Sequence, residues 1–367
     1  MKKVRKTMYL FLAIVALILV VGIWFINQPQ FGKNPSGKRL ERIKKSPNYQ
    51  DGGFKNLSET PQLTSDKPMV VQLYKFFTDK IDHLRPATPI PTVKTDLKNL
   101  PKNENILVWL GHSGYFMQID GKTFLIDPTL LSGSPVSFFN KMFDGSNAYL
   151  PQDIPAVDYL IITHDHWDHL DYETIKQLKP RIGKVVTGLG VGSHFEYWGF
   201  AENNIVELDW NQQTSFGNIK LTALPARHFS GRGLQPKKTL WASFMLETPS
   251  KTIYIGGDSG YDTFYKEIGK QFPNIDLAIL ENGQYDKDWA YIHILPEQIP
   301  QAIKDLNPKR VLGVHNSKFA LAKHDWREPL ELLYQNAQKE NFRLLTPKIG
   351  DVVDLNNENQ TFEKWWK

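Results

Sequence analysis

Hydrophobic and polar positions follow several different spacings along the 367 residues, and the first long run is apolar throughout. Met8–Ile26 is uncharged and rich in Leu, Ile, Val and Ala. As a helix this run would measure roughly 28 Å at about 1.5 Å per residue, close to the hydrocarbon thickness of a bilayer. No small-residue cleavage site follows, since Trp24-Phe25-Ile26 is bulky. The pattern predicts an uncleaved, single-pass membrane anchor at the N-terminus.

The chain that follows the anchor is more polar and irregular. Residues 27–60 hold Pro, Gly, Asn and Ser with few apolar positions, which predicts a linker and lead-in. Residues 86–103 are Pro-rich again. Between them, a helix within 68–85 is predicted by the helical spacing of Val71, Leu73, Phe76, Phe77 and Ile81.

From Ile106 the pattern changes to short apolar runs separated by turn residues, as expected for strands. The pair Asp120-Gly121 predicts a hairpin turn, and Tyr172–Leu178 a helix. Strands are expected at 106–113, 115–119, 124–127, 158–162, 184–186, 203–208 and 219–224. This alternation fits a two-sheet sandwich covered by helices. The predicted organisation is an anchor at 1–27, a lead-in at 28–103 and a folded domain at 104–355.

One long segment, Leu130–Leu150, interrupts the strand pattern and is rich in Ser, Gly and Phe. Loops of this length inside a compact domain are usually functional or mobile. Two roles stay open for its apolar side chains, lining a substrate groove or packing onto the body: Phe138, Phe139, Met142 and Phe143.

Composition and charge exclude several classes of protein. The absence of cysteine rules out disulfides, thiolate zinc sites and a lipoprotein cysteine. Residues 1–45 carry ten Lys or Arg and one acid, a net +9, so the remaining chain has 34 basic and 38 acidic residues, a net −4. A mildly acidic body argues against nucleic-acid binding, whereas a basic leader suits an anionic membrane surface.

The side of the membrane follows less directly from the charges. Six positive side chains soon after the span favour a cytoplasmic body by the positive-inside rule. The very short basic tail before the span resembles the start of an export signal. We favour the extracytoplasmic side.

The strongest chemical signal lies directly after the apolar run that ends at Ile162. His164 and His166 are two positions apart, so in an extended segment both side chains leave the same face. Asp168 and His169 follow, and a turn there would bring them to the same point. Imidazole and carboxylate together suit zinc and similar divalent ions. The complete H-x-H-x-D-H pattern at a strand end favours a metal site over a solvated, pH-sensitive loop.

Three later residues have suitable chemistry and also follow strand-like runs: His228, Asp258 and His315. Each alone is more typical of a turn or a helix cap. Their order after the H-x-H-x-D-H segment makes the joint signal strong.

Taken together, these residues resemble the signature of the metallo-β-lactamase superfamily. The resemblance implies a four-layer αββα fold, an α/β sandwich, with two divalent metals per chain, zinc by default and iron or manganese as alternatives. It implies that one metal is held by His164, His166 and His228. The other would be held by Asp168, His169 and His315, with Asp258 bridging. Asp165 and Asp171 are candidates for orienting the imidazoles, and His112 is expected to be structural.

A narrower resemblance is carried by W-L-G-H-S-G…F-L-I-D-P at 109–128 and by segments 46–56, 239–244, 257–261 and 291–294. These are similar to the N-acyl-phosphatidylethanolamine-hydrolysing phospholipase D branch of the superfamily. The resemblance implies a membrane-anchored phosphodiesterase acting on phospholipid or N-acyl phospholipid head groups. Two metals would activate a water and neutralise developing charge, with Asp168 helping to position that water.

The same branch implies substrate contacts for two further residues. Trp167 and His293 match positions beside the bound lipid, so His293 is expected to contact the leaving group or phosphate. Donation from His293 to a backbone carbonyl is the competing structural role. Relatives often form homodimers, which makes a homodimer a further expectation.

Other functions remain open at the same site. A lactonase or amidase would use the same ligands on a carbonyl carbon and needs no membrane anchor. A scaffold with purely structural metals is disfavoured, because structural zinc sites are usually single, closed and rich in thiolate. A nuclease is disfavoured by the acidic body and the lack of a basic-aromatic stripe.

Overall fold

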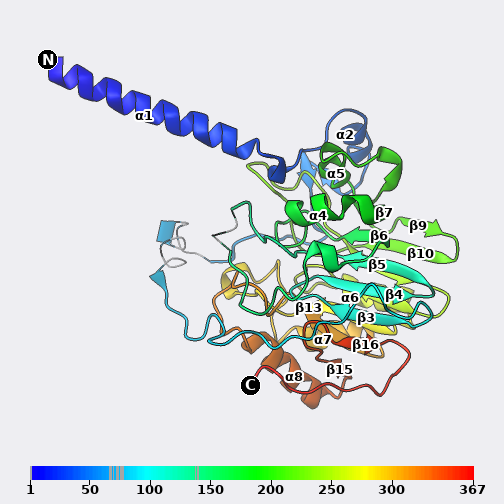
Figure 1. Cartoon of the computed structure of the whole chain (residues 1–367). Coiled ribbons are helices and arrows are strands. Elements are labelled where there is room, and N and C mark those ends of the chain that lie inside the picture. The colour runs from blue at the N-terminus through cyan, green and yellow to red at the C-terminus, as the bar shows by residue number, and fades with distance from the viewer. Residues whose placement is uncertain are drawn as a thin grey trace.

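The computed structural model describes residues 2–65, 68, 70, 71, 74, 78–136, 138 and 140–367. Much of the helix expected within 68–85, including Leu73, Phe76 and Phe77, lies outside the described residues, as does Phe139. Figure 1 shows a rounded body of two stacked sheets with one long helix projecting from it.

Two seven-stranded mixed sheets form the centre of the body. The first has the order β16-β3-β4-β5-β6-β7-β8 and the second β15-β14-β13-β12-β11-β10-β9. The first sheet comprises β3 (Ile106–Trp109), β4 (Tyr115–Ile119), β5 (Lys122–Ile126), β6 (Val157–Ile162), β7 (Ile182–Gly188), β8 (Ile205–Leu208) and β16 (Val352–Asp354). The second comprises β9 (Gln213–Phe216), β10 (Ile219–Leu224), β11 (Ser243–Glu247), β12 (Thr252–Ile255), β13 (Leu277–Glu281), β14 (Val311–Val314) and β15 (Leu344–Leu345).

Helices cover the outer faces of the sandwich (Figure 1). They are α4 (Tyr172–Leu178), α5 (Gly192–Tyr197), α6 (Phe264–Gln271), α7 (Ile299–Leu306) and α8 (Glu328–Glu340). Alternation along β12 explains the layers, because Ile253 and Ile255 join the core between the sheets while Tyr254 joins the core under α6 and α7. Strands buried on both faces read as nearly continuous apolar runs, which is why the sequence revealed them. The predicted αββα fold is therefore confirmed.

The lead-in differs from a free linker. It contains α2 (Gly37–Ile43) and a small hairpin of β1 (Tyr49–Gln50) and β2 (Gly53–Phe54). Arg39 and Arg42 form ion pairs with the buried Glu207, so α2 is held against the folded domain.

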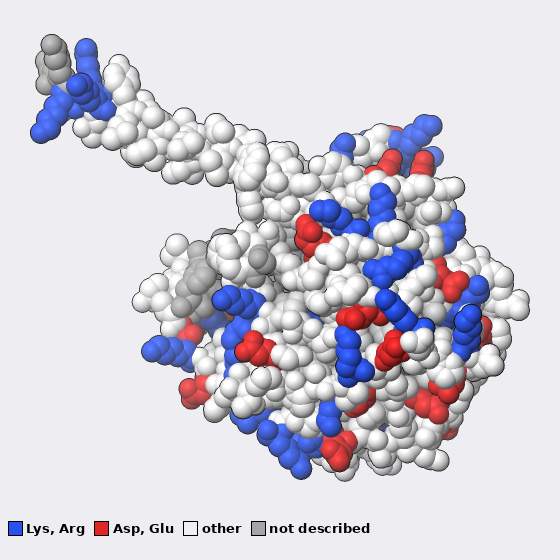
Figure 2. Space-filling model, in the orientation of Figure 1, with Lys and Arg blue, Asp and Glu red and all other residues white. Residues whose placement is uncertain are grey.

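The first helix, α1 (Lys2–Ile26), projects from the body and is exposed along its length. Within the described residues, Lys3–Ile26 is long and apolar enough to cross a membrane. Figure 2 shows Lys and Arg at its free end and an uncharged stretch leading back to the body. Length and composition make it a candidate span, as the sequence predicts.

Candidate metal centre

The predicted ligands are brought to one edge of the sandwich by the strands that precede them. The H-x-H-x-D-H segment follows β6, whereas His228 follows β10, Asp258 follows β12 and His315 follows β14. β10, β12 and β14 run in the same direction within their sheet, so their carboxyl ends meet at the same edge. Asp168 and His315, which lie 147 positions apart in sequence, thereby come into contact.

The first group consists of three imidazoles whose nitrogens converge. His164 Nε2 lies 2.8 Å from His166 Nδ1, which lies 3.1 Å from His228 Nε2. Ligands about 2.1 Å from a tetrahedral ion sit about 3.4 Å from one another. The spacing is therefore that of one coordination sphere.

The second group combines one carboxylate with two imidazoles. Asp168 Oδ2 lies 3.2 Å from His315 Nε2 and 3.7 Å from His169 Nε2. These distances again match ligands around one ion.

Asp258 lies between the two groups. Its Oδ2 is 3.2 Å from His315 Nε2, 3.7 Å from His228 Nε2 and 3.9 Å from His164 Nε2. Its Oδ1 is 3.2 Å from His169 Nε2, yet these two buried atoms make no hydrogen bond to each other or to any other described group. Buried polar atoms without partners are costly. Their position suits two ions sharing Asp258.

In His228 and His169, neighbouring groups hydrogen-bond the ring nitrogen that points away from the other ligands. The nitrogen that faces the other ligands is left without a proton. His228 Nδ1 donates to the Ile292 carbonyl at 2.7 Å, and His169 Nδ1 donates to Asp127 at 2.8 Å. A ring nitrogen can bind a metal only without its proton, so these outer hydrogen bonds select the metal-binding tautomer. The donor set therefore fits divalent metals.

Burial and nearby charges shift the histidine pKa values of the two groups in opposite directions. Burial lowers the pKa of both His164 and His228, which keeps these rings neutral and ready to bind a metal. Burial also opposes the charged form of His315, but the carboxylates of Asp258 and Asp168 outweigh it and raise its pKa to about 10. A metal entering the second group must therefore displace a proton.

The orienting residues differ from those expected. Asp171 accepts from the Leu131 and Ser132 amides and caps α4, so it anchors a loop and touches no imidazole ligand. Asp165 accepts a hydrogen bond at 3.0 Å from His194, which is not one of the predicted ligands. The expected role of Asp171 is therefore wrong, and Asp165 acts on the loop rather than directly on a ligand.

Asp127 and Glu281 fill that role instead. Asp127 bonds His169, and Glu281 Oε2 lies 2.7 Å from His293 Nδ1 and 3.2 Å from His315 Nδ1. Asp127 directly follows the apolar strand β5, and Glu281 is the last residue of the apolar strand β13. An acid at the end of a buried strand was the signal available in the sequence.

His112 lies closer to the site than a purely structural role suggests. Its Nε2 donates to Asp168 Oδ2 at 2.9 Å, and the ring is fully buried. Its backbone is left-handed, with φ 53°, as is that of His315, with φ 67°. Such conformations are sparse for residues other than Gly and concentrate at functional sites. His112 thus positions Asp168.

A cavity of about 460 Å³ opens beside both groups. His293 lines it and donates to the carboxylate of Glu281, not to a backbone carbonyl. Apolar side chains also line it: Leu63, Phe229, Trp289, Ile292 and Leu321.

Trp167 is placed differently from His293. It is not among the residues lining this cavity, and its ring lies between Phe31, at 5.0 Å, and Arg232, at 4.2 Å. Its role in substrate binding stays a prediction. In the Leu130–Leu150 segment, Phe143 is buried and Phe138 is exposed, so Phe143 packs onto the body.

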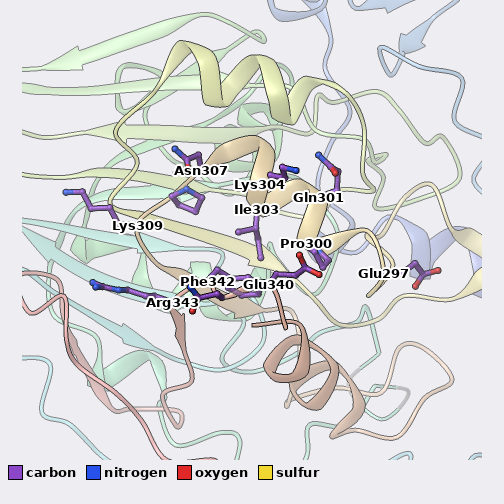
Figure 3. A pocket seen from close by; sticks show the side chains of 12 residues that line it. Glu297, Pro300, Gln301, Ile303, Lys304, Asn307, Lys309, Glu340, Phe342 and Arg343 are labelled. Carbon is purple, nitrogen blue, oxygen red and sulfur yellow. The ribbon is translucent and has the colours of Figure 1, made fainter. Parts of the chain in front are cut away.

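A second, larger cavity of about 720 Å³ lies between α7 and the end of α8 (Figure 3). Asn307, Lys304 and Phe342 are among the side chains around it. None of the predicted ligands lines it, so we place the chemistry in the smaller cavity.

Comparison with known proteins agrees with this geometry. A family model described as the Beta-lactamase superfamily domain matches residues 122–316. An uncharacterized protein of Mycobacterium tuberculosis (strain H37Rv) is 34% identical over 327 residues, 88% of each chain. N-acyl-phosphatidylethanolamine-hydrolyzing phospholipase D 1 of Caenorhabditis elegans is 27% identical over 273 residues, 68% of this chain and 75% of that protein.

The fold also has solved counterparts. Igni18, a metallo hydrolase from the archaeon Ignicoccus hospitalis, superposes with a TM-score of 0.53 at 21% identity, covering 68% of this chain and 98% of its own. The matched region spans the strands and loops that bring the histidines and aspartates together. On this evidence the chain belongs to the metallo-β-lactamase superfamily and is one of its metal-dependent hydrolases.

Proposed function

We propose that the protein is a binuclear phosphodiesterase of phospholipase D type that hydrolyses phospholipid or N-acyl phospholipid head groups. The observation that carries this proposal is the cavity, whose floor holds two ligand groups sharing Asp258 and whose walls include Leu63, Trp289 and Leu321. A polar floor beneath apolar walls suits a substrate with a charged diester and an apolar body.

We assign the proposed ligands to two ions according to the distances between their ligand atoms. One ion is assigned to His164, His166 and His228, and the other to Asp168, His169 and His315. Asp258 is assigned to both. When bound, two such ions would activate a water and neutralise charge that develops on phosphorus.

His293 is assigned the proton transfer to the leaving group. Glu281 holds its Nδ1 at 2.7 Å, which fixes the orientation of the ring. The other ring nitrogen, Nε2, would then deliver the proton to the leaving oxygen. Asp168, held by His112 at 2.9 Å, is assigned to orient the attacking water.

Two further observations support a lipid substrate. The name of the C. elegans relative records hydrolysis of N-acyl-phosphatidylethanolamine. The helix α1 is a candidate anchor, and anchoring would raise the local concentration of lipid at the site. We assign 1–27 to the anchor, 28–103 to the lead-in and 104–355 to the hydrolase domain, on the extracytoplasmic side.

The test compares full-length wild type with Asp258→Ala and His293→Ala in detergent micelles. Metal content is measured beside turnover of phospholipids, a lactone panel and a β-lactam. We expect about two metals in wild type, with lipid turnover. Asp258→Ala should lose metal and turnover together, whereas His293→Ala should keep both metals and lose about 10²–10⁴-fold in rate.

Two results would contradict the proposal. Turnover of carbonyl substrates without phosphodiester turnover would identify a lactonase or amidase on the same site. A wild-type protein that binds no metal would remove the basis for either reaction.

A further inference from the structure

The lead-in reaches the metal centre at three points. We call residues 29–64 the N-terminal strap. The first contact is Asn56, whose Oδ1 accepts from the backbone N–H of His228 at 3.1 Å and whose Nδ2 donates to the His228 carbonyl at 2.8 Å. The indole of Trp241 also donates to Asn56 Oδ1, at 3.0 Å. Both backbone groups of one proposed ligand are thus fixed by one strap side chain.

The second contact passes through Arg232, which is buried. Its Nε and Nη2 donate to the carbonyl of Gln30 in the strap at 3.1 and 2.8 Å. Its Nη1 donates to the carbonyl of Asp165 at 2.9 Å and to the carbonyl of Leu170 at 2.6 Å. The guanidinium therefore bridges the strap to the backbone at Asp165, between His164 and His166, and at Leu170, directly after His169.

The third contact passes through His194. The amide of Lys33 in the strap donates to Nδ1 at 3.0 Å, so the ring carries its proton on Nε2. That nitrogen donates to Asp165 Oδ2 at 3.0 Å. The Gly231 amide donates to the other oxygen of Asp165 at 2.7 Å. The strap thus reaches the side chain of Asp165 through His194 and the backbone of Asp165 through Arg232.

The other ligand group is held from the body of the domain. Asp127 bonds His169, and His112 bonds Asp168. In the part of the chain that the structure describes, no strap residue hydrogen-bonds Asp168, His169 or His315. The strap therefore hydrogen-bonds a proposed ligand directly in the first group, at His228, and reaches the second group only through Arg232 and the carbonyl of Leu170.

We infer that the strap is a positioning element for a single metal, the one assigned to His164, His166 and His228. This inference rests on the proposed ligand assignment. Loss of a strap contact would let the backbone around one ligand move and would widen the distances among His164, His166 and His228. The second group would keep the hydrogen bonds from Asp127 and His112 that hold it. Residues that orient ligands in this way typically change metal affinity 10–100-fold.

The test uses the full-length protein in micelles, loaded with two equivalents of Zn²⁺ and titrated with a competing chelator. Asn56→Ala is compared with Asn48→Ala, the same substitution in the same strap. Asn48 bonds Asp209, which is not a proposed ligand, at 2.8 Å. We expect Asn56→Ala to weaken one of the two Zn²⁺ ions by about 10–100-fold and leave the other unchanged. Asn48→Ala should leave both unchanged.

A milder variant keeps the test usable if Asn56→Ala does not fold. Asn56→Asp retains the acceptor for the His228 amide and loses the donor to its carbonyl, so a smaller loss at the same ion is expected. Equal weakening of both ions, or no difference from Asn48→Ala, would overturn the inference while leaving the two-metal proposal intact. Failure of wild type to bind two ions would overturn both.

Discussion

Lys318 is a buried cation that the proposed chemistry does not use. Its side chain is 1% exposed, and its Nζ donates to the carbonyl of Leu110 at 3.1 Å. Burial lowers the pKa of Lys318 to about 7, because the charged ammonium is poorly solvated there. Its pKa in the unfolded chain is about 10.4. Lys318 therefore binds its proton more weakly in the folded protein than in the unfolded chain.

This shift predicts a pH-dependent stability. Below about pH 7 the lysine is charged in both states, so its full destabilising effect is present. Between pH 7 and about 10.4 the unfolded state binds more protons, so stability rises with pH. Lys318→Met should therefore stabilise the protein by about 1–3 kcal/mol at pH 6 and by progressively less toward pH 10.

The measurement is the unfolding temperature of both proteins across that pH range. Lys176→Met, an exposed lysine on α4, is the control and should change stability by less than about 0.5 kcal/mol. A Lys318→Met variant that is less stable than wild type at pH 6 would show that the ammonium is well compensated.

At the level of single residues, the proposed ligands could be predicted from the sequence, whereas the acids that hydrogen-bond them could not. His164, His166 and His169 stand in one short pattern, so local spacing reveals them. Asp127 and Glu281 belong to no such pattern, and their partners lie 42 and 12 residues away. Only the pairing of strands tells which acid meets which imidazole.

Among the elements, α7 and α8 end in the same way. Asn307 follows α7 with φ 50° and ψ 51°, and Asn341 follows α8 with φ 56° and ψ 45°. The left-handed conformation is strained for residues with a Cβ, least so for Asn and not for Gly. The Asn307 amide closes its helix by donating to the Ile303 carbonyl at 2.8 Å. Asn is therefore the C-terminal signal of both helices.

The cap predicts opposite effects for two small substitutions. Asn307→Gly should leave the free energy of unfolding unchanged or raise it slightly, whereas Asn307→Ala should lower it by about 1 kcal/mol. Thermal unfolding of the two variants, with the same pair made at Asn341, measures the difference. Equal effects of Gly and Ala would show that backbone conformation does not decide stability at this position.

The elements also show where pattern reading stops. Tyr115–Ile119, Tyr172–Leu178 and Ile219–Leu224 were predicted with the bounds that the structure gives. The lead-in was predicted as a linker because its apolar positions are few. It is ordered through side-chain contacts such as Arg39 with Glu207, 168 residues away, which periodicity cannot reveal.

For the whole molecule, the separation of anchor and domain yields the last prediction. Removing residues 1–27 leaves every strap contact from Gln30 onward in place. Turnover of lipid in vesicles should fall by about 10²-fold or more, because the local lipid concentration is lost. Turnover of a water-soluble phosphodiester should stay the same. Parallel assays on both substrates distinguish the two effects, and an equal loss on both would assign α1 a role in folding instead.

The short path from α1 to the metal loop constrains how the enzyme would meet its substrate. The rings of Phe31 and Trp167 lie 5.0 Å apart, and Phe31 comes only five positions after the end of α1 at Ile26. Five extended steps from residue to residue reach at most about 18 Å. If α1 spans the bilayer, the catalytic edge stays within that reach of the leaflet in which α1 ends. The search is then two-dimensional. The rate would follow the mole fraction of substrate in the enzyme's own membrane and would not change when other membranes are added or diluted.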